Sequence, residues 1–278
     1  MSQSLTVVTS RSNPRLKLVR SLAGSSGVRK HGVFLMEGPR FITDYLSVGG
    51  NQPEFAVMSS ECSKEALAAA EKLTGSGIEI LCLPKVLFRE LTDTDHSQGL
   101  AAVCSLPVHG MDAVMSGGTV LLLDRISDPG NVGTAIRSAA AFGCGGVICG
   151  KGTCFPFLPR VTRAAAGWNA MIPLLYRMNA TDAAGKLAES GYTVIAADTS
   201  GRPVGELKLA DDCRVVIVVG SETHGLSEGV VALANEIVAV PMTGGVESLN
   251  AAVSASILLY CLRSSTERGG PIESSSPT

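Results

Sequence analysis

Short apolar runs alternate with amphipathic stretches over the first hundred residues of the chain. Runs of four to eight apolar residues predict strands, and apolar positions at helical spacing predict helices. The predicted helices are residues 14–24, 38–48 and 63–73. The predicted strands are residues 32–38, 54–60, 78–84 and 99–107. The pattern therefore predicts a small α/β unit in this part of the chain.

A second series of apolar runs begins at Thr119, and its runs are continuous, as is typical of strands buried on both faces of a parallel sheet. The predicted strands are residues 119–124, 145–149, 171–176, 192–197, 214–219 and 236–241. The predicted helices are residues 131–142, 159–166, 181–190, 227–235 and 248–263. We therefore expect a parallel sheet covered by helices on both faces, with ligands bound beyond the carboxyl ends of its strands.

These two patterns predict a domain at residues 1–108 and a second at residues 119–265. Residues 109–118 lie between them and contain the glycines typical of a linker. Residues 266–278 are polar and rich in serine and proline, so we expect a disordered tail.

Composition supports a globular enzyme. Of the 278 residues, 45% are hydrophobic and 17% are charged, which excludes a disordered or fibrous chain. The amino-terminal residues contain no apolar segment of a secretory signal, and no apolar run reaches the ~18 residues that a membrane span needs. The sequence therefore predicts a cytoplasmic protein with no membrane association.

Charge is unevenly distributed, although the formal net charge is only −2. Residues 1–40 carry seven basic residues and one acidic residue, a net charge of +6. Residues 129–181 contain five basic residues and no acidic residue. Two basic segments on a mildly acidic chain predict an anionic partner bound at defined surfaces, with ordinary solvated charge as the alternative.

The eight cysteines form no Cys-x-x-Cys pair, and most lie in apolar runs. We therefore expect free, buried thiols rather than disulfides. The spacing of Cys144, Cys149 and Cys154, with no histidine close by, does not suit zinc, so we expect no metal.

A first candidate loop, residues 124–137, reads DRISDPGNVGTAIR. Asp-Pro-Gly makes a turn, Asn131 is a good helix N-cap, and Gly130 and Gly133 permit close approach of another backbone. Arg137 lies where a long cation can reach toward an anion at the start of the helix, and a structural ion pair is the alternative. The loop lacks the Gly-x-Gly-x-x-Gly fingerprint, which argues against a dinucleotide-dependent oxidoreductase.

A second loop follows the apolar strand that ends at Gly220. Glu222 can act there as a base, as a ligand clamp or as a helix cap, and the sequence does not choose among these roles. Ser227 is placed to cap the next helix.

A third loop, residues 240–250, interleaves apolar Val240, Met242 and Leu249 with glycines, so it suits a pocket for an aromatic base and a thioether. Ser248 and Asn250 lie where the last helix is expected to start, and helix capping is the alternative to a functional role for Ser248.

Together, the three loops resemble the SpoU (TrmH-like) family of RNA ribose 2′-O-methyltransferases, within the SPOUT superfamily. The motifs, in chain order, are Asn131-x-Gly133-x-x-x-Arg137, Gly220-x-Glu222-x-x-Gly225, and Val-Pro-Met at residues 240–242 followed by Ser-Leu-Asn at residues 248–250. The resemblance extends less sharply to the amino-terminal residues, which look like the family's L30e-like substrate-binding domain.

This resemblance implies an α/β fold in which a small L30e-like RNA-binding domain precedes a trefoil-knotted parallel-sheet domain that binds S-adenosylmethionine. It also implies a homodimer. The implied cofactor-binding residues are Gly220, Val240, Met242 and Leu249. The implied catalytic residues are Asn131, Arg137, Glu222, Ser248 and Asn250.

The resemblance implies that Arg137 binds the phosphate and hydroxyl region of the target nucleotide. Because the guanidinium pKa lies above ~12, stabilisation of developing charge is a safer role than free base. Family proposals that let this arginine take the proton, assisted by phosphate, stay open. The acceptor is expected to be a 2′-hydroxyl of ribosomal RNA, most simply 23S; transfer RNA, or a non-catalytic RNA-binding or ribosome-assembly role on the same fold, are the alternatives.

The basic segments are then the expected RNA contacts. These candidates are Arg11, Arg15, Lys17, Arg29, Lys30, Arg40 and Arg163.

Overall fold

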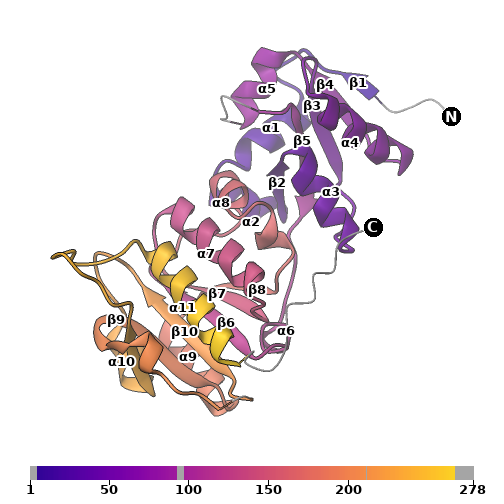
Figure 1. The fold of residues 1–278 in the computed structure, drawn as a ribbon. Helices are drawn as coiled ribbons and strands as arrows, with labels where there is room; N and C mark the ends of the chain where they lie inside the picture. Colours follow the sequence, from indigo (N-terminus) through magenta and orange to yellow (C-terminus); the bar gives the residue numbers. More distant parts are fainter. Residues whose placement is uncertain (1–4, 93–96, 211, 267–278) are drawn as a thin grey trace. The chain divides into compact units, whose positions relative to one another are not determined.

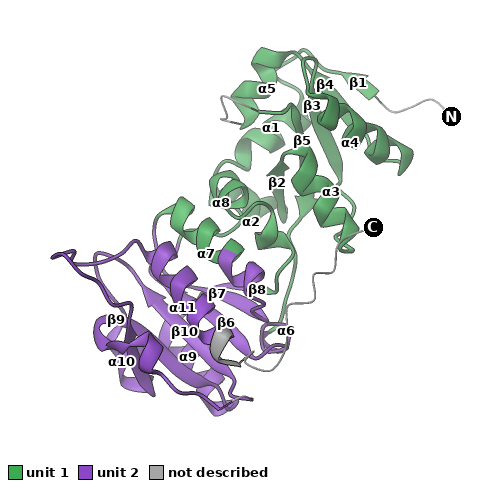
Figure 2. Cartoon of the chain, viewed as in Figure 1, with its two compact units in different colours: residues 1–110, 128–137, 154–174 green, residues 111–127, 138–153, 175–278 purple. Residues whose placement is uncertain are grey.

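The computed structural model describes residues 5–92, 97–210 and 212–266, with side chains up to residue 263. The chain forms two compact units (Figure 2). Unit 1 comprises residues 1–110, 128–137 and 154–174, and unit 2 comprises residues 111–127, 138–153 and 175–278. The two units thus interleave along the sequence. Except for Thr266, the predicted tail lies outside the described residues.

Unit 1 contains a mixed sheet flanked by helices (Figure 1). Its strands are β1 (Leu5–Val7), β2 (Val33–Glu37), β3 (Phe55–Ser59), β4 (Ile80–Leu83) and β5 (Leu100–Ser105). Its helices are α1 (Pro14–Ser21), α2 (Ser25–His31), α3 (Pro39–Ser47), α4 (Lys64–Gly75), α5 (Lys85–Thr92), α8 (Pro159–Ala164) and the 3₁₀ helix η1 (Trp168–Ala170).

The sheet of unit 1 has the order β1-β4-β3-β5-β2. The β1/β4 and β4/β3 pairs are parallel, whereas β3/β5 and β5/β2 are antiparallel. Strands β2 and β3 are buried at every position, which explains their unbroken apolar sequences. All four strands and three helices predicted for this region are confirmed, while β1, α2 and α5 were not predicted.

Helix starts in unit 1 follow ordinary capping chemistry. Asn13 accepts a hydrogen bond from the Arg15 amide, and Pro14 occupies the first position of α1, where its missing N–H costs nothing. Ser63 accepts from the Ala66 amide at the start of α4. These local signals fix where the two helices begin.

Unit 2 contains the second sheet, of order β11-β9-β10-β6-β7-β8. Its strands are β6 (Thr119–Asp124), β7 (Gly146–Gly150), β8 (Leu174–Met178), β9 (Thr193–Pro203), β10 (Val215–Gly220) and β11 (Glu236–Ala239). Its helices are α6 (Met111–Val114), α9 (Ala180–Glu189), α10 (Glu228–Leu233), α11 (Ala251–Thr266) and the 3₁₀ helix η2 (Val204–Glu206). Helix α7 (Pro129–Ala141) begins in unit 1 and ends in unit 2.

The expected parallel sheet is confirmed at four pairings: β11/β9, β9/β10, β10/β6 and β6/β7. Val120, Leu122 and Val218 face α9 in one buried cluster, together with Ala183 and Leu187 of that helix. Because neighbouring strand residues point to opposite faces, Leu121 and Ile217 lie on the other face, where α11 packs against β10. Burial on both faces is why these strands read as continuous apolar runs.

Several boundaries predicted from the sequence differ from those in the structure. The predicted linker contains helix α6, whose Val114 is fully buried, so residues 109–118 are partly core. Strand β9 extends to Pro203, six residues past its predicted end. Strand β8 starts at Leu174 rather than residue 171, because Met171 caps η1 and Pro173 precedes the strand. Helix α11 starts at Ala251 rather than residue 248, because Asn250 caps it.

All eight cysteines lie in the described residues and none forms a disulfide, as predicted. Cys104, Cys144 and Cys149 are buried, and the other five are half-buried. In the described part of the chain, no helix has both the length and the hydropathy to cross a membrane.

Candidate active site

Unit 2 contains a cavity with a volume of about 190 Å³. It lies at the carboxyl ends of β10 and β11, where ligands of parallel sheets bind, and beside residues 197–199 in the middle of β9. The start of α11 closes it with Ala251, Ser254 and Leu258. Of the sequence-predicted site residues, the cavity lining includes Gly220, Glu222, Val240, Met242, Ser248 and Leu249.

The floor of the cavity depends on two glycines in the β10–α10 loop. A Cβ at Gly220 would lie 2.4 Å from the Gly225 carbonyl oxygen, so only glycine permits this close turn. Gly225 has φ of +60°, and its amide donates to the Ser221 carbonyl at 2.8 Å. The Gly-x-Glu-x-x-Gly motif is therefore a tight turn that holds Glu222 at the cavity.

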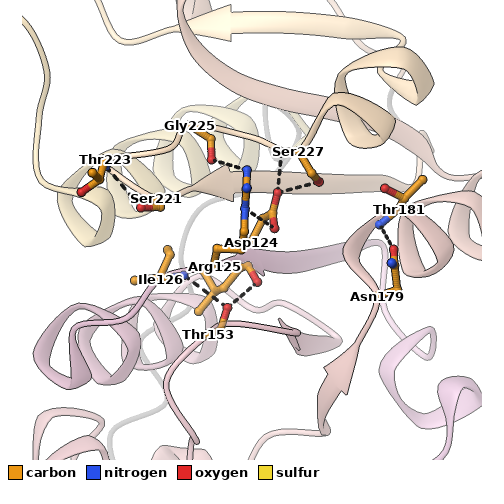
Figure 3. A network of polar contacts seen from close by, with 11 residues as sticks. Asp124, Arg125, Ile126, Thr153, Asn179, Thr181, Ser221, Thr223, Gly225 and Ser227 are labelled. Carbon is orange, nitrogen blue, oxygen red and sulfur yellow. Dashed lines mark hydrogen bonds and ion pairs between the residues drawn. The ribbon is translucent and has the colours of Figure 1, made fainter.

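Asp124, at the end of β6, fixes the other end of this loop. Its side chain is 2% exposed, and its Oδ2 accepts hydrogen bonds from the Ser227 amide at 2.7 Å and the Ser227 hydroxyl at 2.8 Å (Figure 3). Ser227 occupies the N-cap position of α10 as expected, but its hydroxyl donates to Asp124 and makes no capping bond to the helix. Asp124 was not identified from the sequence. The sequence signal that could have identified it is an acidic residue directly after a buried apolar run. In the structure this position places Asp124 opposite Gly220 on the neighbouring strand.

Arg125 adds a second tie to the same loop. Its guanidinium lies 3.4 Å from Asp124 Oδ1 and donates to the Gly225 carbonyl at 3.4 Å. The carboxylate and the guanidinium thus brace opposite sides of the turn that lines the cavity (Figure 3).

Glu222 serves as a cap in this structure. Its Oε1 accepts a hydrogen bond from the Ala251 amide, the first of α11, at 2.8 Å. Asn250 Oδ1 accepts from the Ala252 and Val253 amides at 2.9 and 3.2 Å. The Glu222 carboxylate oxygen and the Asn250 amide oxygen therefore both lie at the positive end of α11. Asn250, rather than Ser248, is the N-cap residue of this helix. Ser248 is exposed at the cavity, whereas Asn250 is not part of its lining.

The cavity wall combines apolar and polar groups. Val240, Met242 and Leu249 supply apolar surface, while Asp198, Glu222 and Glu247 supply carboxylates. Such a mixture suits a ligand with a flat apolar ring, polar hydroxyls and a positive centre.

Helix α7 carries the other two predicted catalytic residues, in the part of the chain that belongs to unit 1. The prediction that Asn131 is its N-cap is wrong: Asp128 takes that place, and its Oδ1 accepts from the Asn131 amide at 2.7 Å. Gly133 has the predicted packing role, because a Cβ there would lie 2.5 Å from the Ala164 Cβ of α8. A Cβ at Gly130 would approach only Asp128.

Arg137 is exposed, and among the described residues its guanidinium makes no ion pair or hydrogen bond. Within the described ranges, therefore, no structural ion pair involves Arg137. Its guanidinium is a permanent cation in contact with solvent, available to an anionic ligand.

The predicted RNA-binding residues differ in their surroundings. Arg11 pairs with Glu90, and Arg15 pairs with Glu79 while stacking on Phe55 with its guanidinium carbon 5.0 Å from the ring centroid. Lys17 and Lys30 are exposed. The Arg40 Nε lies 3.7 Å from an Asp44 oxygen, and the Arg29 guanidinium carbon lies 5.6 Å from the Phe155 centroid.

Arg163 lies in a partly buried ion pair. Its Nη1 is 3.1 Å from Glu37 Oε2, and it also donates to the Thr92 carbonyl at 3.2 Å. The Glu37 side chain is only 6% exposed. This arrangement gives Arg163 a structural role in unit 1.

The chain was compared with known protein families. Residues 118–260 match the SpoU rRNA Methylase family, and residues 13–102 match the MRM3-like substrate binding domain.

Relatives of known name are similar over nearly the whole chain. The 23S rRNA (guanosine(2553)-2'-O)-methyltransferase RlmP of Bacillus subtilis is 31% identical over 257 residues, which cover 92% of this chain and 98% of that protein. An uncharacterized tRNA/rRNA methyltransferase of Synechocystis is 28% identical, with 94% of each chain covered.

Solved structures share the fold. The AdoMet-bound rRNA methyltransferase from Sinorhizobium meliloti matches with a TM-score of 0.80 and 26% identity, covering 94% of this chain and 98% of that one. The SpoU methyltransferase AviRb from Streptomyces viridochromogenes, in complex with AdoMet, matches with a TM-score of 0.78 and 25% identity, covering 91% and 98%.

Proposed function

Because the chain belongs to the SpoU rRNA methylase family, we propose that it transfers a methyl group from S-adenosylmethionine to a ribose 2′-hydroxyl of 23S ribosomal RNA. The observation that carries this proposal is the cavity of unit 2, which gathers the second and third motifs at the carboxyl ends of β10 and β11. The named relative acts on 23S rRNA, and this favours ribosomal RNA over transfer RNA.

The cavity fits the cofactor. At Gly220 and Gly225 the cavity is lined by backbone alone, and Met242 and Leu249 offer an apolar surface for an adenine ring. Carboxylates of Glu222 and Glu247 suit a positively charged sulfonium. When bound, S-adenosylmethionine supplies an electrophilic methyl group.

We assign cofactor binding and substrate orientation to residues of the chain. Gly220, Val240, Met242 and Leu249 line the wall that holds the cofactor. Glu222 and Asn250 fix the start of α11, and Ser248, exposed at the cavity, orients substrate by hydrogen bonding. Holding the hydroxyl in line with the methyl group lowers the barrier by ~7 kcal/mol or more.

Arg137 is the proposed catalytic cation. A ribose hydroxyl becomes negatively charged as it loses its proton, and an unpaired guanidinium stabilises that charge and the neighbouring phosphate. Asn131, three positions past the cap of α7, is the proposed orienting partner on the same helix.

We also propose that the enzyme is a homodimer. Val253 and Tyr260 lie two turns apart on α11 and are 44% and 62% exposed. Large apolar side chains aligned on one face of a helix favour burial against a second copy. Tyr260→Arg is expected to shift the molecular mass from dimer to monomer in light scattering; an unchanged mass would place the interface elsewhere.

The test of function uses labelled S-adenosylmethionine with 23S ribosomal RNA and, separately, transfer RNA from cells lacking the gene. Label in 23S RNA, mapped to a 2′-O-methyl position, is the expected result. Label only in transfer RNA would correct the substrate, and no label in either would favour the non-catalytic RNA-binding role.

Arg137→Ala tests the assigned chemistry. Methyl transfer is expected to fall by about 10²–10³-fold, as when a transition-state charge loses its partner, while calorimetry shows near-normal S-adenosylmethionine binding. Loss of both activities would instead show that Arg137 supports the fold.

A further inference from the structure

Three neighbouring strands of unit 2 each lead to a basic residue at the carboxyl edge of the sheet. Arg125 follows β6, Lys151 follows β7, and Arg177 is the penultimate residue of β8. None of the three belongs to a motif of the cofactor cavity. We call this group the cationic edge.

Hydrogen bonds join the three turns. The Thr153 hydroxyl donates to the Leu123 carbonyl at 2.9 Å and accepts from the Ile126 amide at 3.3 Å, which ties the turn after β7 to the turn after β6 (Figure 3). The Lys151 amide donates to the Met178 carbonyl at 2.7 Å, which ties the same turn to β8. The cationic edge is therefore one continuous structure.

Arg125 packs directly over the middle turn. A Cβ built on Gly152 would lie 3.1 Å from Arg125 Cγ, so the side chain of Arg125 crosses the residue that follows Lys151. The aliphatic part of Arg125 therefore lies beside the turn that carries Lys151, while its guanidinium faces Asp124 and Gly225.

Two of these residues hold strained backbones. Arg125 has φ of +61° and Arg177 has φ of +63°, and Ala166 is the one other non-glycine residue with positive φ in the described ranges. Left-handed backbone costs an L-residue roughly 1–2 kcal/mol, and such strain collects at functional sites. Both arginines stand where asparagine or glycine would relieve this cost.

The outer two cations are available for a ligand. Lys151 and Arg177 are exposed, and within the described residues neither makes an ion pair or a side-chain hydrogen bond. The nearby acids are Asp124, which is 2% exposed and bound to Ser227, and Asp182 in the first turn of α9. No described residue therefore neutralises Lys151 or Arg177, whereas Arg125 is paired with Asp124.

The cationic edge begins where the cavity ends. Strand β6 pairs with β10, and Asp124 stands opposite Gly220 in their register. Neighbouring strands lie about 4.8 Å apart, so β6 to β8 spans roughly 10 Å along the sheet edge. The cavity wall at Gly220 therefore lies one strand spacing from the start of this edge.

We infer that the cationic edge binds the phosphodiester backbone of the RNA strand beside the ribose that is methylated. The inference rests on the proposed function and adds an RNA contact in the same unit as the cofactor cavity. Lys151 and Arg177 bind phosphates as positioning residues, whereas Arg125 also braces the cavity loop.

The test compares Lys151→Gln/Arg177→Gln with Lys186→Gln/Lys208→Gln. The control removes two exposed lysines that lie in the segments leading to the amino ends of β9 and β10, in the same unit. Binding of 23S ribosomal RNA is measured over a range of salt concentrations, and KM and kcat for methyl transfer are measured with the same RNA.

Loss of two phosphate contacts is expected to lower the slope of log affinity against log salt by about 1.4 for a single strand. KM for RNA is expected to rise at least fivefold, while S-adenosylmethionine affinity and thermal midpoint match those of the control. Equal slopes and equal KM values in both variants would overturn the inference.

Measurements on the wild-type enzyme distinguish a failure of the proposed RNA contact from a failure of the proposed reaction. If it transfers label to RNA and the edge variant keeps a normal KM, only the cationic edge is wrong. If it transfers no label but still binds RNA with a slope that the edge variant lowers, the edge stands and the proposed reaction fails.

Discussion

Two basic regions of this molecule have opposite electrostatic surroundings. In unit 1, Arg11 and Arg15 pair with Glu90 and Glu79, and Arg163 pairs with buried Glu37. In unit 2, Lys151 and Arg177 stand exposed with no such partner among the described residues. Yet residues 1–40 have the larger net charge in the sequence, +6.

The difference shows that a local charge sum overstates the charge available to a ligand. The glutamates that neutralise Arg11 and Arg15 come from residues 79 and 90, which the sum over residues 1–40 leaves out. An arginine already bound to a carboxylate must give up that partner before it binds a phosphate. The unpaired cations are therefore the better candidates for RNA contacts.

The strongest test of this comparison is Arg163→Ala. If the ion pair is structural, the variant leaves the Glu37 carboxylate buried without its partner, and the free energy of unfolding falls by about 3 kcal/mol. This is the low end for a broken buried pair, because the Arg163 side chain is 27% exposed. Urea unfolding measures the change.

Two companion variants sharpen that result. Glu37→Gln together with Arg163→Ala is expected to recover part of the loss, since a neutral amide is cheaper to bury than a carboxylate. Lys17→Ala, at an exposed position of α1, is expected to change stability by less than about 0.5 kcal/mol. Wild-type stability with weakened RNA binding in Arg163→Ala would restore Arg163 as an RNA contact.

The next largest effect is expected at the junction of the cavity and the cationic edge. Asp124→Asn keeps one acceptor oxygen but removes the charge that faces Ser227 and Arg125. Looser attachment of the β10–α10 loop is expected to raise the Kd for S-adenosylmethionine about tenfold, equivalent to about 1.4 kcal/mol.

Calorimetry measures that Kd, and Asp182→Asn is the matched control. Asp182 undergoes the same chemical change in the same unit, at an exposed position on α9. An Asp124→Asn protein with unchanged Kd would show that the glycine turn holds its shape without the carboxylate.

Local patterns predicted most of the fold, and the family motifs predicted six of the residues that line the cavity, but not its carboxylates Asp198 and Glu247. Continuous apolar runs identify β6 and β10, and the Gly-x-Glu-x-x-Gly spacing identifies the turn that holds Glu222. The role of Asp124 was not predicted, because its partner, Ser227, is 103 residues away in the sequence. The residues around Asp124 do not show which partner its carboxylate binds.

The capping errors have a similar origin. Asp128 and Asn131 are both good N-cap residues, and the choice depends on whether Pro129 occupies the first helical position, as it does here. Ser227 had the right residue type for a cap, but a stronger acceptor, the Asp124 carboxylate, lay close to it in the fold.

Within unit 1, the comparison of paired and exposed cations predicts a smaller effect, on the salt dependence of RNA affinity. Arg11→Gln/Arg15→Gln removes two paired cations, whereas Lys17→Gln/Lys30→Gln removes two exposed ones. If availability decides RNA binding, the lysine variant lowers the salt slope of RNA affinity by about 1.4 and the arginine variant by clearly less. A larger loss in the arginine variant would mean that RNA displaces Glu79 and Glu90.

The last prediction is that two buried thiols stay unreactive in the folded protein. Their protection is a control that shows whether each charge variant is still folded. Each unit carries a buried thiol whose pKa burial raises from 9.0 to about 12: Cys104 in unit 1 and Cys144 in unit 2. At pH 8 this leaves about a thousandfold less thiolate than in the unfolded chain, so alkylation by iodoacetamide is expected to spare both thiols until urea is added. Peptide mass spectrometry reads the two sites separately. If a charge variant exposes Cys104 or Cys144 in buffer, that unit has opened, and its weaker RNA binding reports lost structure rather than lost charge.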